Sequence, residues 1–110
     1  MIVRGGENIS PSEVEDVLRL HTAVQDVAVL GVPDQEWGER IVAAVVAPGG
    51  VAEEELRSLV RAKLRSTRVP EQIFFYESLP YNETGKLLRR HLRSEITAGL
   101  DQRVGDVLAI

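Results

Sequence analysis

Hydrophobic residues along this chain follow two different spacings, which separate predicted helices from predicted strands. Apolar positions three or four residues apart indicate one face of a helix, whereas alternating or continuous apolar positions indicate a strand. The predicted helices begin at Ser10-Pro11 and cover 53–65 and 87–96, and the predicted strands cover 24–32, 41–47 and 73–76. The pattern therefore predicts about three central strands interleaved with three helices.

The first of these helices has the clearest start signal. Ser10 occupies the cap position, Pro11 follows where a missing N–H costs nothing, and Glu13 stands three residues after the cap. This spacing predicts a capping box, in which the Ser10 hydroxyl and the Glu13 carboxylate each accept a backbone N–H. The apolar face that follows consists of Val14, Val17 and Leu18.

Glycine and proline indicate how the strands are connected. Gly5-Gly6 lies between two short apolar arms and predicts a β-hairpin over 1–9. The continuous apolar run 41–47 ends at the Pro-Gly-Gly of 48–50, which is typical of a buried central strand. Together these signals predict an α+β (α/β-like) fold, with a small sheet, three flanking helices and a preceding hairpin.

Composition narrows the class of protein. The chain has 110 residues, of which 44% are hydrophobic and 27% charged, as expected for one soluble globular domain. The absence of cysteine excludes disulfides and thiolate metal sites, and it favours a cytoplasmic location. The two histidines are far apart in the sequence, so no metal site is expected. No apolar run is long enough for a transmembrane segment, and no signal peptide is recognised.

Charge is divided unevenly along the chain, whose net charge is −4. Residues 1–55 hold 11 acidic and 3 basic residues, whereas residues 56–110 hold 6 acidic and 10 basic ones. A domain that binds nucleic acid is usually basic overall, so nucleic acid is not an expected partner. Two interpretations of the basic half remain: a site for a small anion, or helix faces that are simply solvated.

Positive charge is concentrated around Lys86. The pattern predicts a loop over 80–86, with Thr84 or Gly85 opening the last helix, which places Lys86, Arg89 and Arg90 in its first turn. Cations there oppose the helix dipole. The conflict indicates either that Lys86 meets an anion from elsewhere or that these residues solvate an exposed face.

Two apparent motifs in this segment carry no function. Gly85-Lys86 is followed by Leu87 instead of Ser or Thr and lacks the earlier glycine of a phosphate-binding P-loop. The tripeptide 82–84 has the form of a glycosylation acceptor, which has no meaning without a secretory signal.

Three segments resemble, in order, the C-terminal domain of AMP-forming acyl-CoA synthetases. These enzymes belong to the adenylate-forming superfamily, together with luciferases and the adenylation domains of nonribosomal peptide synthetases. The three segments are R-G-G-E-N-I-S-P-S-E-V-E at 4–15, G-V-P-D-Q-E-W-G-E-R at 31–40 and L-P-Y-N-E-T-G-K-L-L-R at 79–89. The resemblance covers residues 1–96, and the remaining residues, 97–110, are expected to form a C-terminal tail.

The resemblance implies a division of labour between two domains. A large N-terminal domain, absent from this chain, holds MgATP and the carboxylic acid, and the small domain is mobile. A carboxylate first attacks the α-phosphate of ATP to form an acyl-adenylate, and the thiol of CoA then displaces AMP. The implied function is that of a fatty-acid or other carboxylate–CoA ligase in the cytoplasm. The implied partners are the large domain of the same enzyme, ATP with Mg²⁺, an acid and CoA.

The resemblance assigns the first step to Lys86. Its ammonium matches the family's catalytic lysine, which holds the carboxylate and the α-phosphate together although both are anions. Gly85 allows the backbone to approach closely. Arg89 supports the same loop, or it is an ordinary arginine on a helix surface.

The resemblance assigns the second step to a different face. The hairpin at Gly5-Gly6, followed by Glu7, lines the pantetheine tunnel, although two glycines also suit any tight turn. Trp37 matches a position that contacts the CoA nucleotide in some relatives, and its alternative is a partly buried core anchor. Arg68 provides a cation for a CoA phosphate, whereas Thr67 stands where relatives often carry an aromatic residue.

Two other functions compete with that of a CoA ligase. One is an adenylation enzyme that loads the pantetheine of a carrier protein, and the other is a standalone, non-catalytic docking module. Under the ligase interpretation, the 110-residue chain alone is expected to form no adenylate, because the residues that bind the acid and most of ATP lie in the large domain.

Overall fold

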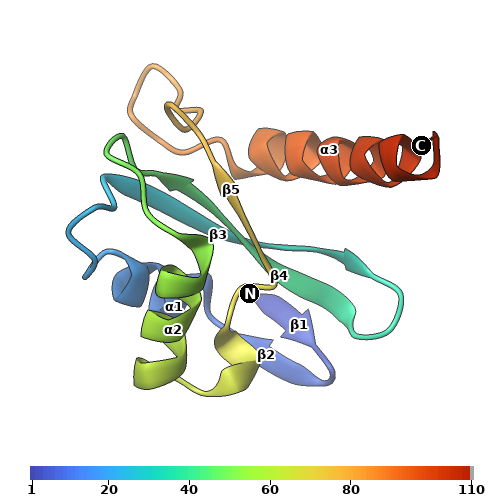
Figure 1. Cartoon of the computed structure of the whole chain (residues 1–110), viewed down its shortest axis with the longest axis horizontal. Coiled ribbons are helices and arrows are strands. Elements are labelled where there is room, and N and C mark those ends of the chain that lie inside the picture. The colour runs from blue at the N-terminus through green and yellow to red at the C-terminus, as the bar shows by residue number, and fades with distance from the viewer. Residues whose placement is uncertain (110) are drawn as a thin grey trace. The chain divides into compact units, whose positions relative to one another are not determined.

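The computed structural model describes the backbone of residues 1–109 and the side chains of residues 1–99. The chain divides into two compact units, Met1–Leu79 and Pro80–Ile110. The strands are β1 (Ile2–Arg4), β2 (Glu7–Ile9), β3 (Asp26–Asp34), β4 (Gly38–Val46) and β5 (Gln72–Phe75). The helices are α1 (Pro11–Leu18), α2 (Glu53–Lys63), a 3₁₀ turn η1 (Ser66–Arg68) and α3 (Arg89–Ala109) (Figure 1).

The first unit is built around the long strand β4. On one side β4 pairs with β3 along its whole length, antiparallel, with Asp34 opposite Gly38 at the hairpin end. It also pairs antiparallel with β1, where Arg4 lies opposite Gly38, and parallel with β5. The predicted α+β class is confirmed, but the sheet has five strands, because the hairpin β1–β2 joins β4 instead of standing apart.

Helices α1 and α2 pack on one face of this sheet (Figure 1). Their buried residues meet every second residue of β3 and β4, as the period of a strand requires. This core comprises Ile2, Ile9, Val14, Val17, Leu18, Val27, Val29, Ile41, Ala43, Val45, Leu56, Val60 and Ile73. The intervening residues of β4, Val42, Ala44 and Val46, are buried as well. The prediction of a buried central strand from the apolar run 41–47 is therefore confirmed.

The start of α1 agrees with the prediction in position but not in hydrogen bonding. Ser10 is the N-cap and Pro11 begins the helix, yet the Ser10 side chain makes no capping hydrogen bond, so the capping box is not formed. The acidic residue of α1 that is held by a hydrogen bond to the sheet is Glu15, which is only 4% exposed. Its Oε2 accepts the backbone N–H of Val29 in β3 at 2.8 Å. A buried carboxylate therefore ties α1 to the sheet.

The second unit begins with the predicted loop, but the last helix begins later than predicted. An isolated antiparallel bridge joins Tyr81 to Leu87, and α3 begins only at Arg89. Lys86 therefore precedes the helix instead of lying in its first turn, because Gly85 adopts a positive φ of 83° and the chain reverses there. The spacing of Leu88, Leu92 and Ile96 in the sequence predicts one inward helix face. Leu92 and Ile96 are buried, but Leu88 is 40% exposed and precedes the helix, so that part of the prediction is wrong.

The helix α3 is longer than the predicted segment 87–96, and it continues to Ala109. The predicted tail at 97–110 lies mostly among residues whose side chains are outside the description. Over the described residues, no helix combines the length and the apolar character needed to cross a bilayer.

Candidate functional site

The loop before α3 holds Lys86 by a set of short hydrogen bonds. Asn82 Oδ1 accepts the N–H of Lys86 at 2.9 Å and both the N–H and the hydroxyl of Thr84, at 3.0 and 2.7 Å. The backbone N–H of Asn82 in turn donates to the carbonyl of Lys86 at 2.9 Å, and the N–H of Gly85 donates to the carbonyl of Asn82 at 3.0 Å. The lysine is therefore presented from an ordered turn.

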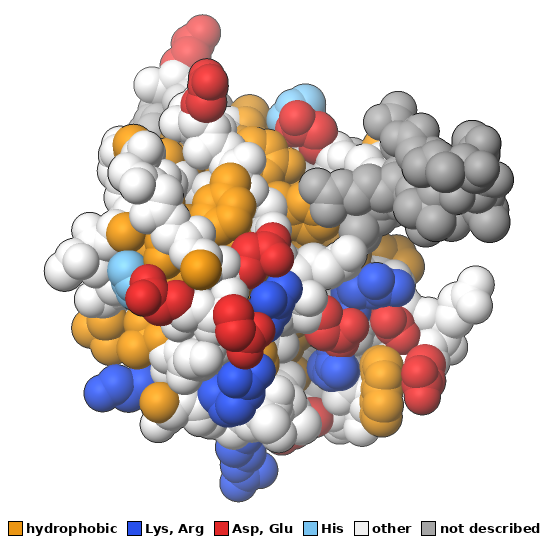
Figure 2. Space-filling model, in the orientation of Figure 1, with side chains coloured by type: hydrophobic (Ala, Val, Ile, Leu, Met, Phe, Trp, Pro, Cys, Tyr) orange, Lys and Arg blue, Asp and Glu red, His pale blue; other side chains and the backbone are white. Residues whose placement is uncertain are grey.

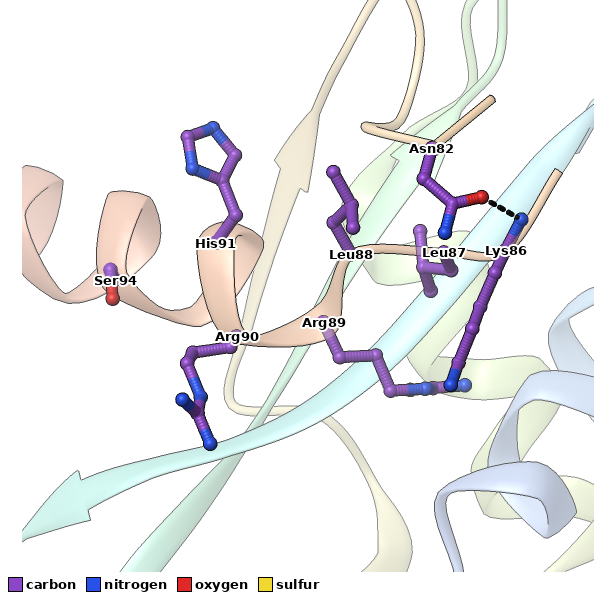
Figure 3. A pocket seen from close by; sticks show the side chains of 8 residues that line it. All are labelled: Asn82, Lys86, Leu87, Leu88, Arg89, Arg90, His91 and Ser94. Carbon is purple, nitrogen blue, oxygen red and sulfur yellow. Dashed lines mark hydrogen bonds between the residues drawn. The ribbon is translucent and has the colours of Figure 1, made fainter. Parts of the chain in front are cut away.

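Lys86 also lines an open pocket together with the first turns of α3. The pocket is lined by Asn82, Lys86, Leu87, Leu88, Arg89, Arg90, His91 and Ser94 (Figure 3). In Figure 3 the side chains of Lys86 and Arg89 extend toward the same side of the loop. No described acidic group lies within ion-pair distance of the Lys86 ammonium. This end of the second unit therefore presents positive charge suited to an anionic ligand.

The predicted CoA residues lie in the first unit, around the hairpin β1–β2. Gly5 and Gly6 have φ values of 55° and 81°, the two positive angles that a type I′ turn requires. The N–H of Gly5 donates to the carbonyl of Trp37 at 2.9 Å. A Cβ added at Gly5 would lie 3.1 Å from Cε3 of the Trp37 ring. Gly5 is therefore needed both for the turn and for the close approach of the indole.

Trp37 lies at the turn between β3 and β4 and is 45% exposed, so it is not a core anchor. The Arg4 guanidinium lies over its ring, 5.5 Å from the centroid. The turn is organised by Asp34, whose Oδ1 accepts the N–H groups of Glu36 and Trp37, each at 2.9 Å. These hydrogen bonds lower the pKa of the Asp34 carboxyl below its ordinary value of 3.8, and the bond from the Trp37 N–H has the largest effect.

Glu7 and Arg68 form an ion pair beside the same hairpin. Arg68 Nη1 lies 2.6 Å from Glu7 Oε1 and 3.0 Å from the Thr67 hydroxyl, and its side chain is only 15% exposed. The hydrogen bond from Arg68 lowers the pKa of Glu7. Arg65 lies 3.7 Å from the same carboxylate and is 81% exposed. Both arginines therefore pair with Glu7, but Arg68 does so at the shorter distance, and Arg65 is the more exposed of the two.

The predicted site residues thus form two groups. Gly5, Gly6, Glu7, Trp37 and Arg68 gather around the hairpin, and Gly85, Lys86 and Arg89 gather at the start of α3. Sequence reasoning missed the two residues that organise these groups, Asp34 and Asn82. Each precedes a turn and accepts backbone N–H groups two to four residues ahead, a known preference of Asp and Asn in turns. The sequence Asn-x-Thr-Gly at 82–85 is typical of such a turn.

The uneven division of charge along the chain does not produce two charged faces. On the face shown in Figure 2, acidic and basic side chains lie next to one another. The ion pairs explain this mixing, since Arg57 and Arg61 of the basic half contact glutamates at the start of α2, and Arg65 and Arg68 contact Glu7. Several arginines of the basic half are therefore paired with glutamates, whereas Lys86 has no described acidic group within ion-pair distance.

The sequence matches the family described as the AMP-binding enzyme C-terminal domain over residues 13–86. The chain belongs to this family. It is 47% identical over 93 residues to a 2-succinylbenzoate–CoA ligase of Bacillus cereus, a match that covers 84% of this chain and 19% of the ligase. The chain therefore spans about a fifth of the length of the curated relatives it matches.

Solved structures of AMP-binding enzymes contain the same fold. A fatty acyl-CoA synthetase of Mycobacterium tuberculosis is similar with a TM-score of 0.86 and 39% identity, over 90% of this chain and 20% of that one. An amide bond synthetase, McbA, from Marinactinospora thermotolerans is similar with a TM-score of 0.80 and 38% identity, over 84% of this chain and 19% of that one. The predicted resemblance to AMP-forming ligases is thereby confirmed.

The described residues of this AMP-binding C-terminal domain offer no cluster of three His, Cys, Asp or Glu side chains that could hold a metal ion. The chemistry that they do offer is a lysine on an ordered loop and, in the first unit, a glycine turn near Arg65, Arg68 and the exposed indole of Trp37.

Proposed function

We propose that this chain is the mobile small domain of an AMP-forming carboxylate–CoA ligase, which contributes Lys86 to acyl-adenylate formation and its hairpin to thioester formation. The two groups of residues suit two separate steps, because each presents a different kind of surface. The observation that carries the proposal is the Lys86 loop. The Lys86 ammonium is exposed and has no described acidic partner, and hydrogen bonds hold both the N–H and the carbonyl of the lysine.

The first step requires a cation between two anions. A carboxylate oxygen forms a bond to the α-phosphorus of ATP, and the bond from that phosphorus to pyrophosphate breaks. Negative charge crowds on the phosphoryl oxygens as the two anions meet. A positioned ammonium stabilises that charge and holds the reactants in line, and removing one such donor typically slows a reaction by about 10²–10³-fold. Lys86 suits this role.

The second step requires a narrow passage for pantetheine and a docking surface for the CoA nucleotide. The CoA sulfur bonds to the acyl carbon, AMP leaves, and the thiol proton passes to solvent. The glycine turn at Gly5-Gly6 presents backbone without side chains, as a thin ligand requires. The exposed face of Trp37 suits stacking on adenine. Arg65, which is 81% exposed and lies 3.7 Å from Glu7, suits a CoA phosphate better than Arg68, which is 15% exposed and bonded to Glu7 at 2.6 Å.

The remaining substrates and the metal are assigned to the large domain in this proposal. It holds the acid, most of ATP and Mg²⁺, so the identity of the acid is set outside this chain. Support for the overall assignment comes from the names of the relatives, which include a 2-succinylbenzoate–CoA ligase and a fatty acyl-CoA synthetase.

A domain exchange tests the proposal. This chain replaces the matched segment of the Bacillus cereus ligase, and the chimera is assayed with 2-succinylbenzoate for adenylate-dependent pyrophosphate exchange. Thioester formation is measured separately from supplied acyl-adenylate, with CoA and with a pantetheine-bearing carrier protein as acceptors. Lys86→Ala is expected to lower pyrophosphate exchange by at least about 10²-fold and to spare the thioester step with CoA.

The chain's other lysine provides the matched control. Lys63 is exposed in the last turn of α2, and Lys63→Ala is expected to leave both steps unchanged. Three outcomes contradict the proposal: full adenylation by the Lys86→Ala chimera, a folded chimera with neither activity, or transfer to the carrier protein but not to CoA. The isolated chain is expected to show no pyrophosphate exchange.

A further inference from the structure

We propose that Asn82 is a positioning residue for Lys86, which sets the direction in which the lysine leaves the loop. This inference rests on the proposed function, because it concerns the lysine assigned to adenylate formation. It adds a second residue to that step, one that acts through Lys86 without touching the substrates.

Three donor groups converge on a single atom of Asn82. Asn82 Oδ1 accepts three hydrogen bonds, from the N–H of Lys86 and from the N–H and the hydroxyl of Thr84. All three partners are donors, so the amide must face them with its oxygen. The short side chain of Asn reaches them because the chain turns back at Gly85, whose φ is 83°.

Lys86 forms two hydrogen bonds with Asn82. Its N–H donates to Asn82 Oδ1 at 2.9 Å, and its carbonyl accepts the N–H of Asn82, also at 2.9 Å. Both backbone groups of the lysine are therefore bonded to one residue. Because these bonds fix the peptide planes on either side of the Lys86 Cα, they also fix the direction of its Cα–Cβ bond.

In Figure 3 the Lys86 side chain runs away from Asn82, toward the side where Arg89 also extends. Lys86 is exposed, and its four-carbon stem has many rotamers. Without a fixed Cα–Cβ direction, the ammonium would sample a wider volume. A misplacement of about 1 Å at a reacting centre costs roughly 10²-fold in rate.

The loop offers a matched comparison within the same hydrogen-bonded turn. The Thr84 hydroxyl donates to the same Asn82 Oδ1 at 2.7 Å. Thr84→Val removes this bond and keeps the bond to the Lys86 N–H. Asn82→Ala removes all three side-chain bonds, and Asn82→Asp keeps an oxygen in the same place.

The test uses these variants in the Bacillus cereus ligase chimera, with Lys86→Ala in parallel. Asn82→Ala is expected to lower pyrophosphate exchange by about 10- to 100-fold and to leave the thioester step unchanged. Asn82→Asp is expected to recover most of the loss, and Thr84→Val to cost less than about fivefold. Hydrogen exchange of the Lys86 amide, measured by NMR in the 110-residue chain, is expected to accelerate in Asn82→Ala but not in Asn82→Asp.

The outcomes separate this inference from the proposed function. If Lys86→Ala abolishes pyrophosphate exchange while Asn82→Ala does not change it, Asn82 has no positioning role and the proposed function stands. Equal loss of both half-reactions in Asn82→Ala, or no recovery in Asn82→Asp, would show a general structural role and overturn the inference. If Lys86→Ala itself has no effect, the proposed function fails first.

Discussion

Glu15 is expected to be the most important acidic residue for the stability of the first unit. It lies on α1, is 4% exposed, and accepts the N–H of Val29 in β3 at 2.8 Å. Val29 is itself fully buried. Glu15→Ala removes the carboxylate and leaves that N–H without this acceptor, in a place that water does not reach.

The magnitude follows from two contributions. Loss of the acceptor for a buried N–H costs about 1–3 kcal/mol. Loss of the γ-methylene, which is buried with the rest of the side chain, adds about 0.8 kcal/mol. Glu15→Ala is therefore expected to lower the free energy of unfolding by about 2–4 kcal/mol. Glu15→Gln keeps an oxygen acceptor and the stem, so its cost is expected to be smaller.

Urea unfolding of the 110-residue chain, followed by circular dichroism, measures this difference when the m-values of the variants agree. Glu13→Ala is the matched control, because Glu13 lies in the first turn of the same helix but is exposed. Its loss is expected to cost about 0.3–1 kcal/mol through the helix dipole. If Glu15→Ala costs no more than Glu13→Ala, the buried hydrogen bond does not stabilise the fold and the reasoning is refuted.

Two further predictions concern the hairpin and the turn beside it. Asp34 has a lowered pKa, so its ionised form contributes stability above about pH 4, and this stability is lost as the pH falls through the lowered pKa. The difference in unfolding free energy between the unmutated chain and Asp34→Asn should therefore be large near neutral pH and small in acid. A difference that stays constant with pH would contradict this prediction. Gly5→Ala and Gly6→Ala both place a side chain at a positive φ, a strain of about 1–2 kcal/mol. Only Gly5→Ala also crowds Trp37, at 3.1 Å, so thermal unfolding should show Gly5→Ala to be the less stable, and equal melting temperatures would contradict that.

Much of the local structure could be predicted from the sequence because it depends on neighbours along the chain. The Gly5-Gly6 turn needs two positive φ angles, which glycine adopts without cost, and the structure has both. Pro11 marks the first residue of α1, and the run 41–47 closely matches the buried strand β4. Hydrophobic spacing is a local property, so these elements were correctly placed within a few residues.

The last helix begins later than predicted because a local turn competes with it at Lys86. The basic residues and the apolar spacing at 87–96 predicted a helix that opened at Thr84 or Gly85. Asn82 Oδ1 instead accepts the N–H groups of Thr84 and Lys86 in a turn where Gly85 has a φ of 83°, outside the helical region. The helix is therefore delayed to Arg89.

By itself, the sequence determined the order and type of the elements, the glycine turn and the family resemblance around Lys86, since each depends on residues close together in the chain. Tertiary structure alone decided that the hairpin joins β4, that Glu15 is buried against β3, and that Glu7 is paired with Arg68 across 61 positions of sequence. Those contacts join distant segments, and only the packing of the sheet brings their partners within reach.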